Sequence, residues 1–141
     1  MIILLMKNYI LLKPPEQVFK SKYAICYDLI ELERQLFEKY NYEIKTFFSY
    51  QNLPIEENPT HTYLIFKEDS KYYWFEISWQ SYKSIQGPFN SYLDCVKYVN
   101  NKLKESWKSK TIYTLEYKKF NYSNMNINQF GNYILKNGIK V

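Results

Sequence analysis

The chain has 141 residues, a length that suits one domain with its own buried core and requires neither a disulfide nor a metal to hold it. Its formal net charge is +5, and aromatic residues make up 20% of it. The lysines are spread among acidic residues rather than clustered, so we expect no nucleic-acid partner. No segment approaches the ~18 apolar residues of a membrane span, and two cysteines do not form the disulfide framework of a secreted protein.

The first residues, 1–7, are apolar but lack the charged start and the cleavage site of a signal peptide. We interpret them as a first strand or a mobile start, and we expect a cytoplasmic protein. Residues 14–20 begin with two prolines, which the first turn of a helix accommodates because its N–H groups need no partner within the helix. They predict a short helix.

The clearest helix signal covers residues 24–40, and Asn41 is the expected end because asparagine tolerates the left-handed cap conformation. Apolar residues recur at helical spacing and predict the packed face of this helix: Ile25, Leu29, Ile30, Leu32, Leu36 and Phe37. Charged residues between them predict its solvent face: Glu31, Glu33, Arg34, Glu38 and Lys39.

Alternating aromatic and β-branched residues predict three strands, at residues 42–50, 60–67 and 71–79. Residues 51–59 carry two prolines and predict a loop. Glu68-Asp69-Ser70 predicts a short hairpin connection between the second and third strands. Residues 81–89 contain Gly87-Pro88 and predict another loop.

The remaining residues predict a second long helix, a strand and a short helix. Ser91 followed by Asp94 resembles a capping box, and the helix face after it consists of Leu93, Val96, Val99 and Leu103. Residues 111–117 predict a strand and residues 126–135 a short helix. The order of helix, strands, helix and strand predicts an antiparallel α+β fold.

Cys26 lies in the first turn of the helix predicted at residues 24–40. Unpaired backbone N–H groups and the helix dipole favour negative charge at such a position, which stabilises a thiolate. Because the thiolate is the reactive form of cysteine, this position predicts a nucleophile.

His61 begins the second predicted strand, and Glu76 lies on the third. A hairpin turn about Glu68-Asp69 puts His61 directly opposite Glu76. A turn about Asp69-Ser70 puts Glu76 opposite Tyr63 and diagonal to His61. Both registers leave the two side chains on one face and within reach of each other. Because a carboxylate beside an imidazole fixes its tautomer, this pair and the cysteine at the helix start predict a nucleophile–base–acid triad.

Each of these residues also has a simpler interpretation. A single cysteine in a helix is commonly a small apolar residue, a histidine on a strand is commonly structural, and a glutamate in an aromatic strand is often only paired or exposed. We interpret Cys95, inside the second long helix, as structural because free cysteines are commonly buried. A zinc site built from His61 and two cysteines needs a fourth ligand, so we expect no metal.

The pattern resembles the transglutaminase-like branch of the papain-like cysteine enzymes. In that family a cysteine begins a helix that packs on an antiparallel sheet, a histidine begins one strand, and an acid, usually aspartate, lies on the adjoining strand. The resemblance is carried by Ile25-Cys26-Tyr27-Asp28, Glu31-Leu32-Glu33-Arg34, Pro59-Thr60-His61-Thr62-Tyr63 and Tyr73-Trp74-Phe75-Glu76. The chain departs from it at Tyr27, where tryptophan is frequent, at Ala24, where glycine is common, and at Glu76. More closely, the chain looks like small bacterial proteins of that superfamily.

The resemblance covers residues 16–117, which it implies as the core of a single domain with a C-terminal extension at residues 118–141. It implies cysteine-dependent acyl transfer on amide or isopeptide bonds of a protein or peptide substrate, through a thioester and without a cofactor. Cys26 is then the nucleophile, His61 the base and Glu76 the residue that orients it. Gln17 is a candidate second oxyanion donor. The candidates for lining the cleft are Tyr27, Trp74 and Trp79.

Two other functions stay open at this point. A catalytically inactive protein-binding module on the same fold has the same residues, because a fold and a triad-like arrangement do not prove turnover. Nucleic-acid binding, the third reading, predicts an affinity that falls steeply with salt. The sequence does not specify the oligomeric state.

Overall fold

The computed structural model describes residues 24–122 and 124–141, with the backbone alone at residues 24–28. Its elements are α3 (Ala24–Lys39), β1 (Glu43–Tyr50), η1 (Ile55–Glu57), β2 (Thr60–Glu68), β3 (Lys71–Glu76), η2 (Gln80–Tyr82), β4 (Ser84–Phe89), α4 (Tyr92–Trp107), β5 (Tyr113–Tyr117), α5 (Ile127–Asn137) and β6 (Ile139–Lys140). The predictions for residues 1–7 and 14–20, and for Gln17, lie outside the described residues.

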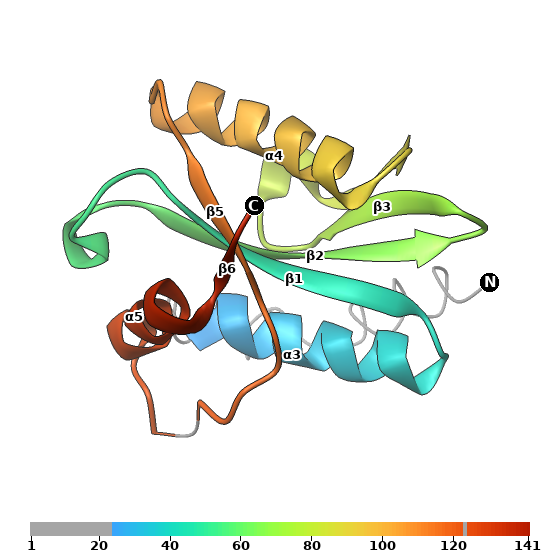
Figure 1. Ribbon diagram of the computed structural model, residues 1–141, viewed down its shortest axis with the longest axis horizontal. Helices are drawn as coiled ribbons and strands as arrows, with labels where there is room; N and C mark the ends of the chain where they lie inside the picture. The colour runs from blue at the N-terminus through green and yellow to red at the C-terminus, as the bar shows by residue number, and fades with distance from the viewer. Residues whose placement is uncertain (1–23, 123) are drawn as a thin grey trace.

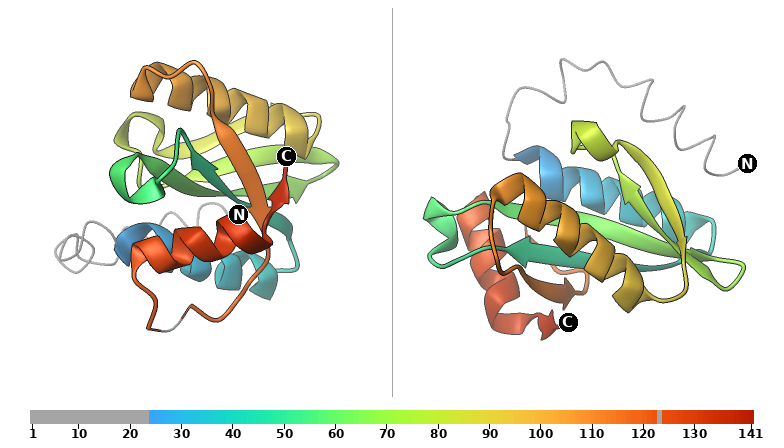
Figure 2. Two further views of the ribbon diagram at one scale, coloured as in Figure 1. Left: turned by 60° about the vertical axis from the view of Figure 1, so that its left-hand side comes forward. Right: turned by 90° about the horizontal axis from the view of Figure 1, so that it is seen from above.

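The described elements form three layers around one six-stranded sheet of order β4-β3-β2-β1-β5-β6. Every pairing in it is antiparallel. Helix α4 covers one face of the sheet, and α3 and α5 cover the other, as Figure 1 and both views of Figure 2 show. The prediction of an antiparallel α+β fold is confirmed.

Helix α3 ends at Lys39, one residue before the predicted end, and its buried face is rotated from the predicted one. The buried positions are Ile30, Glu33, Arg34 and Phe37, which follow the i, i+3, i+4, i+7 spacing of one helix face. The prediction that Glu33 and Arg34 face solvent is wrong, because both side chains are buried. Arg34 is accommodated because its Nη2 donates to Oγ1 of Thr46 at 2.6 Å on β1. Asn41 ends the helix with φ of 63°, as predicted.

The β2–β3 hairpin adopts the second of the two registers that the sequence allowed. Glu68 pairs with Lys71, and the two turn residues Asp69 and Ser70 have φ of 49° and 66°. Two positive φ values are the signature of a turn whose twist matches the flanking strands. The register continued along the strands brings Glu76 level with Tyr63 and diagonal to His61, as one of the alternatives predicted.

Strand β3 is shorter than predicted, and the predicted loop after it contains a strand. β3 ends at Glu76 rather than at Trp79, because the Glu76 side chain binds the backbone N–H groups of the next residues and turns the chain. Residues 84–89 form β4. Gly87-Pro88 is compatible with this strand because β4 is the edge of the sheet, where a proline breaks no ladder on its outer side.

Two apolar clusters fill the spaces between the layers. Phe47, Tyr63, Ile65 and Trp74 pack under α4 with Cys95, Val96, Val99 and Leu103. Phe48, Leu64, Phe66 and Phe75 pack on the opposite face with Ile30, Phe37, Phe130 and Ile134. In α4, Leu93 was predicted on the packed face but is 48% exposed, and Cys95 is buried instead. The two clusters show which sheet face each strand residue points to.

Residues 118–141, predicted as an extension beyond the core, contribute to both the core and the sheet. Phe130 and Ile134 of α5 belong to the apolar cluster under α3, and β6 pairs with β5. Asn126 and Gln129 form a full capping box at the start of α5, which satisfies two backbone donors at once. The described C-terminal residues are therefore part of one folded unit with the strands.

Gly138 joins α5 to β6 at a point with no room for a side chain. A Cβ there lies 2.7 Å from the backbone oxygen of Ile134 and 3.1 Å from Cβ of Leu115. We expect Gly138→Ala to destabilise the fold by about 1–3 kcal/mol, since backbone must move. Urea unfolding measures the change, and Lys140→Ala, at an exposed position of β6, is the control. A Gly138→Ala midpoint equal to that of the control contradicts the close approach.

Candidate functional site

The carboxylate of Glu76, one of the predicted site residues, accepts five hydrogen bonds from other described residues. Its Oε2 accepts from Nε2 of His61 at 2.8 Å and from Nε1 of Trp74 at 3.1 Å. Its Oε1 accepts from the backbone N–H and the hydroxyl of Ser78, at 3.0 and 2.8 Å, and from the backbone N–H of Trp79 at 3.0 Å. Glu76 is 2% exposed, and these donors replace the water that it loses.

The bonds of Glu76 also explain its charge. Burial on its own raises the pKa of Glu76. The attraction of His61 and the hydrogen bonds from His61, Ser78 and Trp79 lower the pKa, and together they outweigh burial, so the pKa lies below its ordinary value. The carboxylate is therefore ionised at neutral pH. Because an ionised carboxylate only accepts hydrogen bonds, Nε2 of His61 carries a proton.

Three side chains hold the His61 ring, and one of its two nitrogens has no hydrogen-bond partner among the described residues. Its ring stacks on Tyr63, with centroids 5.7 Å apart, and meets the edge of Trp79 at 5.5 Å. Glu76 holds Nε2, and no residue in the described part of the chain hydrogen-bonds the other ring nitrogen, Nδ1. His61 is 9% exposed. The pair thus presents one ring nitrogen that can accept a proton, with a fixed tautomer behind it.

The pair lies at one end of the sheet, on the α4 face. His61 is two residues from Tyr63, and Glu76 is two residues from Trp74, so both share the face of the cluster under α4. Helix α3 packs on the other face, but it begins at the same end of the sheet, because it runs antiparallel to β1 through the turn at Asn41 (Figure 1). The backbone of Cys26 lies in the first turn of α3, as predicted, and its side chain is outside the described residues.

A row of buried polar groups that was not predicted from the sequence continues from His61 across the sheet. Ser49 of β1 pairs with His61 in the strand register. The Ser49 and Thr114 hydroxyls are 2.7 Å apart, and Thr114 donates to Oδ1 of Asn100 on α4 at 2.9 Å. Since the Thr114 hydroxyl donates its one hydrogen bond to Asn100, the Ser49 hydroxyl is the donor to Thr114, and the Ser49 oxygen can still accept a hydrogen bond. The strand register is the signal that would have identified Ser49.

The two tryptophans predicted to line a cleft have different positions. Trp74 is fully buried among four aromatic rings, so it belongs to the core and not to a cleft wall. Trp79 is partly exposed and contacts His61. Of the other candidates, the Tyr27 side chain and Gln17 lie outside the described residues.

Cys95 is fully buried in the cluster under α4. Burial raises the pKa of its thiol, which keeps the sulfur protonated and unreactive. Its place agrees with the structural role expected from the sequence. Within residues 24–122 and 124–141, no group of three or more His, Cys, Asp or Glu side chains is placed to hold a metal ion.

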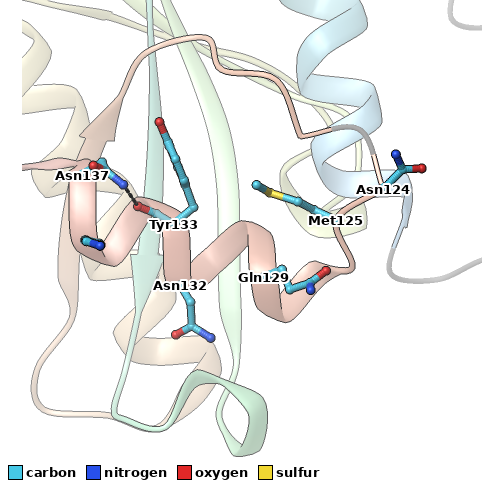
Figure 3. A pocket seen from close by; sticks show the side chains of 7 residues that line it. Asn124, Met125, Gln129, Asn132, Tyr133 and Asn137 are labelled. Atoms are coloured by element: carbon cyan, nitrogen blue, oxygen red, sulfur yellow. Dashed lines mark hydrogen bonds between the residues drawn. The ribbon is translucent and has the colours of Figure 1, made fainter.

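Two cavities that the described residues line both lie along α5, away from His61. The larger, about 670 Å³, is a groove beside Gln129, Asn132, Tyr133 and Asn137 (Figure 3). Its amides already serve the fold: Asn132 donates to Glu56 at 2.9 Å, and Asn137 donates to the backbone oxygen of Tyr133 at 3.0 Å. The smaller cavity, about 260 Å³, lies between α5, β5 and β6. Neither includes the His61–Glu76 pair.

Comparison of the chain with protein-family models, with curated proteins and with solved structures finds no match. The resemblance to transglutaminase-like enzymes therefore depends on the sequence motif alone. Among the described helices, none is long and apolar enough to cross a membrane.

Proposed function

We propose that this protein is a cysteine-dependent acyl-transfer enzyme of transglutaminase-like type, acting on amide or isopeptide bonds. Cys26 is its nucleophile, His61 its general base and acid, and Glu76 the residue that orients His61. The observation that carries the proposal is the hydrogen bond of 2.8 Å between His61 and Glu76, which leaves one ring nitrogen of His61 without a partner among the described residues.

The His61–Glu76 pair has the properties that a base in a triad requires. The ionised carboxylate fixes which ring nitrogen is protonated and stabilises the imidazolium that forms when Nδ1 takes a second proton. Tyr63 and Trp79 hold the ring from two sides, and five hydrogen bonds hold the carboxylate. A group fixed in this way loses little entropy when it acts on a reacting atom.

The place of α3 supports Cys26 as the nucleophile. The N-terminus of α3 lies at the same end of the sheet as His61 and Glu76, and a helix N-terminus favours a thiolate.

The proposed reaction runs through a thioester. Nδ1 of His61 takes the Cys26 thiol proton, and the thiolate adds to the amide carbonyl, whose oxygen the backbone N–H of Cys26 stabilises. The carbon–nitrogen bond breaks as His61 returns the proton to the leaving amine. Water or a second amine, deprotonated by His61, then attacks the thioester and releases the thiol.

The second candidate function is a binding module without turnover, and one observation favours it. The His61–Glu76 pair lies on the α4 face of the sheet, whereas α3 packs on the opposite face. On this reading the pair is a structural network that anchors the end of β3 to β2. Because α3 and the pair lie on opposite faces, the enzyme requires the Cys26 thiol to reach the His61 imidazole around the end of the sheet. That end is where β3 stops, at Glu76.

Thiol reactivity distinguishes the two functions without a known substrate. An ordinary thiol with a pKa of about 8.5 is only a few per cent thiolate at pH 7, so we expect iodoacetamide to alkylate a stabilised Cys26 at least about tenfold faster. The intact chain is labelled between pH 5 and 9 and then digested, and mass spectrometry of the peptides gives separate rates for Cys26 and Cys95. In His61→Gln, Cys26 should fall to the rate and pH profile of an ordinary thiol.

Two controls complete the experiment. Lys71→Gln changes an exposed residue at the other end of β3 and should leave the rate at Cys26 unchanged. Cys26→Ser identifies the labelled peptide. If Cys26 reacts as an ordinary thiol in the parent chain, or if His61→Gln leaves its rate unchanged, the enzyme proposal is wrong and the binding module is favoured.

A further inference from the structure

Glu33 is a buried acid at the centre of the packed face of α3. It is 1% exposed and lies between Ile30 and Phe37, which both belong to the apolar cluster on that face of the sheet. An ionised carboxylate in such surroundings is costly unless it is paired or hydrogen-bonded. Its partners therefore decide its charge.

The described residues offer neither oxygen of Glu33 a hydrogen-bond partner. The neighbouring cation, Arg34, is committed elsewhere: Nη2 donates to Thr46, and Nε lies 3.3 Å from the Glu31 carboxylate. Lys119 also pairs with Glu31, at 3.4 Å. The contrast with Glu76 is large, since that carboxylate has five donors.

The charged and titratable groups around Glu33 do not favour its ionisation. From its own helix come Glu31 and Arg34, already paired with each other, and β5 contributes the Tyr117 ring. Beyond them, β1, β2 and α5 face α3 with uncharged side chains: Thr46, Phe48, Leu64, Phe66, Phe130 and Ile134. Glu76, at the end of β3 on the α4 face of the sheet, adds a negative charge from the other side. Burial first, and the negative charge of Glu76 second, raise the pKa of Glu33 well above its ordinary value.

We propose that Glu33 is a proton-dependent latch for α3: the packed helix holds this carboxyl in its protonated form, and rising pH shifts the equilibrium toward a loosened helix that releases the proton. The latch does not depend on the proposed enzymatic function. Where that function holds, the latch also controls the helix on which the nucleophile is carried.

The direction of the pH effect follows from the two states of the carboxyl. In packed α3 the group binds its proton more tightly than in the free chain, so the packed state is fully favoured below the ordinary glutamate pKa. As pH rises from there toward the raised pKa, the free state releases a proton that the packed state keeps. The opening equilibrium of α3 then increases by up to tenfold per pH unit and levels off above the raised pKa.

Hydrogen exchange on the full chain tests the latch. Amide exchange in α3 is measured between pH 5 and 9 and corrected for the intrinsic rate, which gives the opening equilibrium at each pH. In the parent chain we expect this equilibrium to rise with pH, by up to about tenfold per pH unit, until it levels off above the raised pKa of Glu33. Glu33→Gln, which keeps the shape of the protonated acid, should show no such rise and should protect α3 more strongly at pH 9.

Two further variants separate the latch from other effects. Glu38→Gln removes an exposed acid from the same helix and should retain the pH dependence of the parent chain. Glu33→Met removes the acid with a flexible apolar side chain and should behave like Glu33→Gln, which gives a second test if the amide variant folds poorly. Equal pH dependence in the parent chain and both Glu33 variants, or weaker protection of both variants at pH 9, overturns the proposal.

Discussion

Glu76→Gln is expected to destabilise the fold by about 3–5 kcal/mol, the cost of breaking a buried charge-assisted network. The carboxylate accepts five hydrogen bonds through its two oxygens. An amide of the same shape has one accepting oxygen and an NH₂ group. Whichever way it turns, its NH₂ faces donors, either those of His61 and Trp74 or those of Ser78 and Trp79. Urea unfolding at pH 7 measures the loss.

The control for this prediction is His61→Gln, which removes one donor from the same network. It should cost clearly less than Glu76→Gln, because four donors still hold the carboxylate. The stability of the parent chain measured at low pH gives a second check. Since the pKa of Glu76 is lowered in the fold, its stabilisation is present above the ordinary glutamate pKa and is lost as pH falls through the lowered value. Equal stabilities of Glu76→Gln and His61→Gln contradict the central role of the carboxylate.

Trp74→Ala is expected to cost about 3–5 kcal/mol, the range for removing a large buried aromatic side chain. Trp74 is fully buried, its ring contacts those of Tyr63, Trp79, Tyr82 and Tyr98, and its Nε1 donates to Glu76. Thermal and urea unfolding measure the change.

Two matched variants define what the Trp74 result means. Trp74→Phe keeps a ring in the core and removes the indole donor, so it should fall between the parent chain and Trp74→Ala. Trp79→Ala removes a partly exposed ring and should cost less than Trp74→Ala. A folded Trp74→Ala variant with the unfolding midpoint of the parent chain contradicts the core position of Trp74 and favours the predicted position in a cleft wall.

The elements whose local pattern matches their final surroundings could be predicted from the sequence. Helix α3 and its end at Asn41, the β2–β3 hairpin and the fold class all follow from periodicity and turn chemistry. The shared face of His61 and Glu76 also followed, because both allowed registers gave it. Only the tertiary structure chose between those registers.

The errors arose where a partner distant in sequence decides. Glu33 and Arg34 are charged, so a single-helix reading put them in solvent, but Thr46 of β1 accommodates Arg34 and the sheet buries Glu33. β4 was missed because Gly87-Pro88 is a loop signal unless the strand is an edge. Which face of the sheet α3 would cover relative to His61 depends on how the layers stack, which no local pattern contains.

The irregular edge of the sheet at β4 has a consequence for the behaviour of the protein in concentrated solution. A sheet this rich in aromatic side chains invites fibril growth, in which a further chain adds to a regular edge. At β4, however, Gly87 has φ of +141° and Pro88 offers no N–H, and the register with β3 shifts between Tyr72 and Trp74. A further chain that pairs with β4 therefore finds an interrupted hydrogen-bond ladder, which protects this edge of the sheet against aggregation.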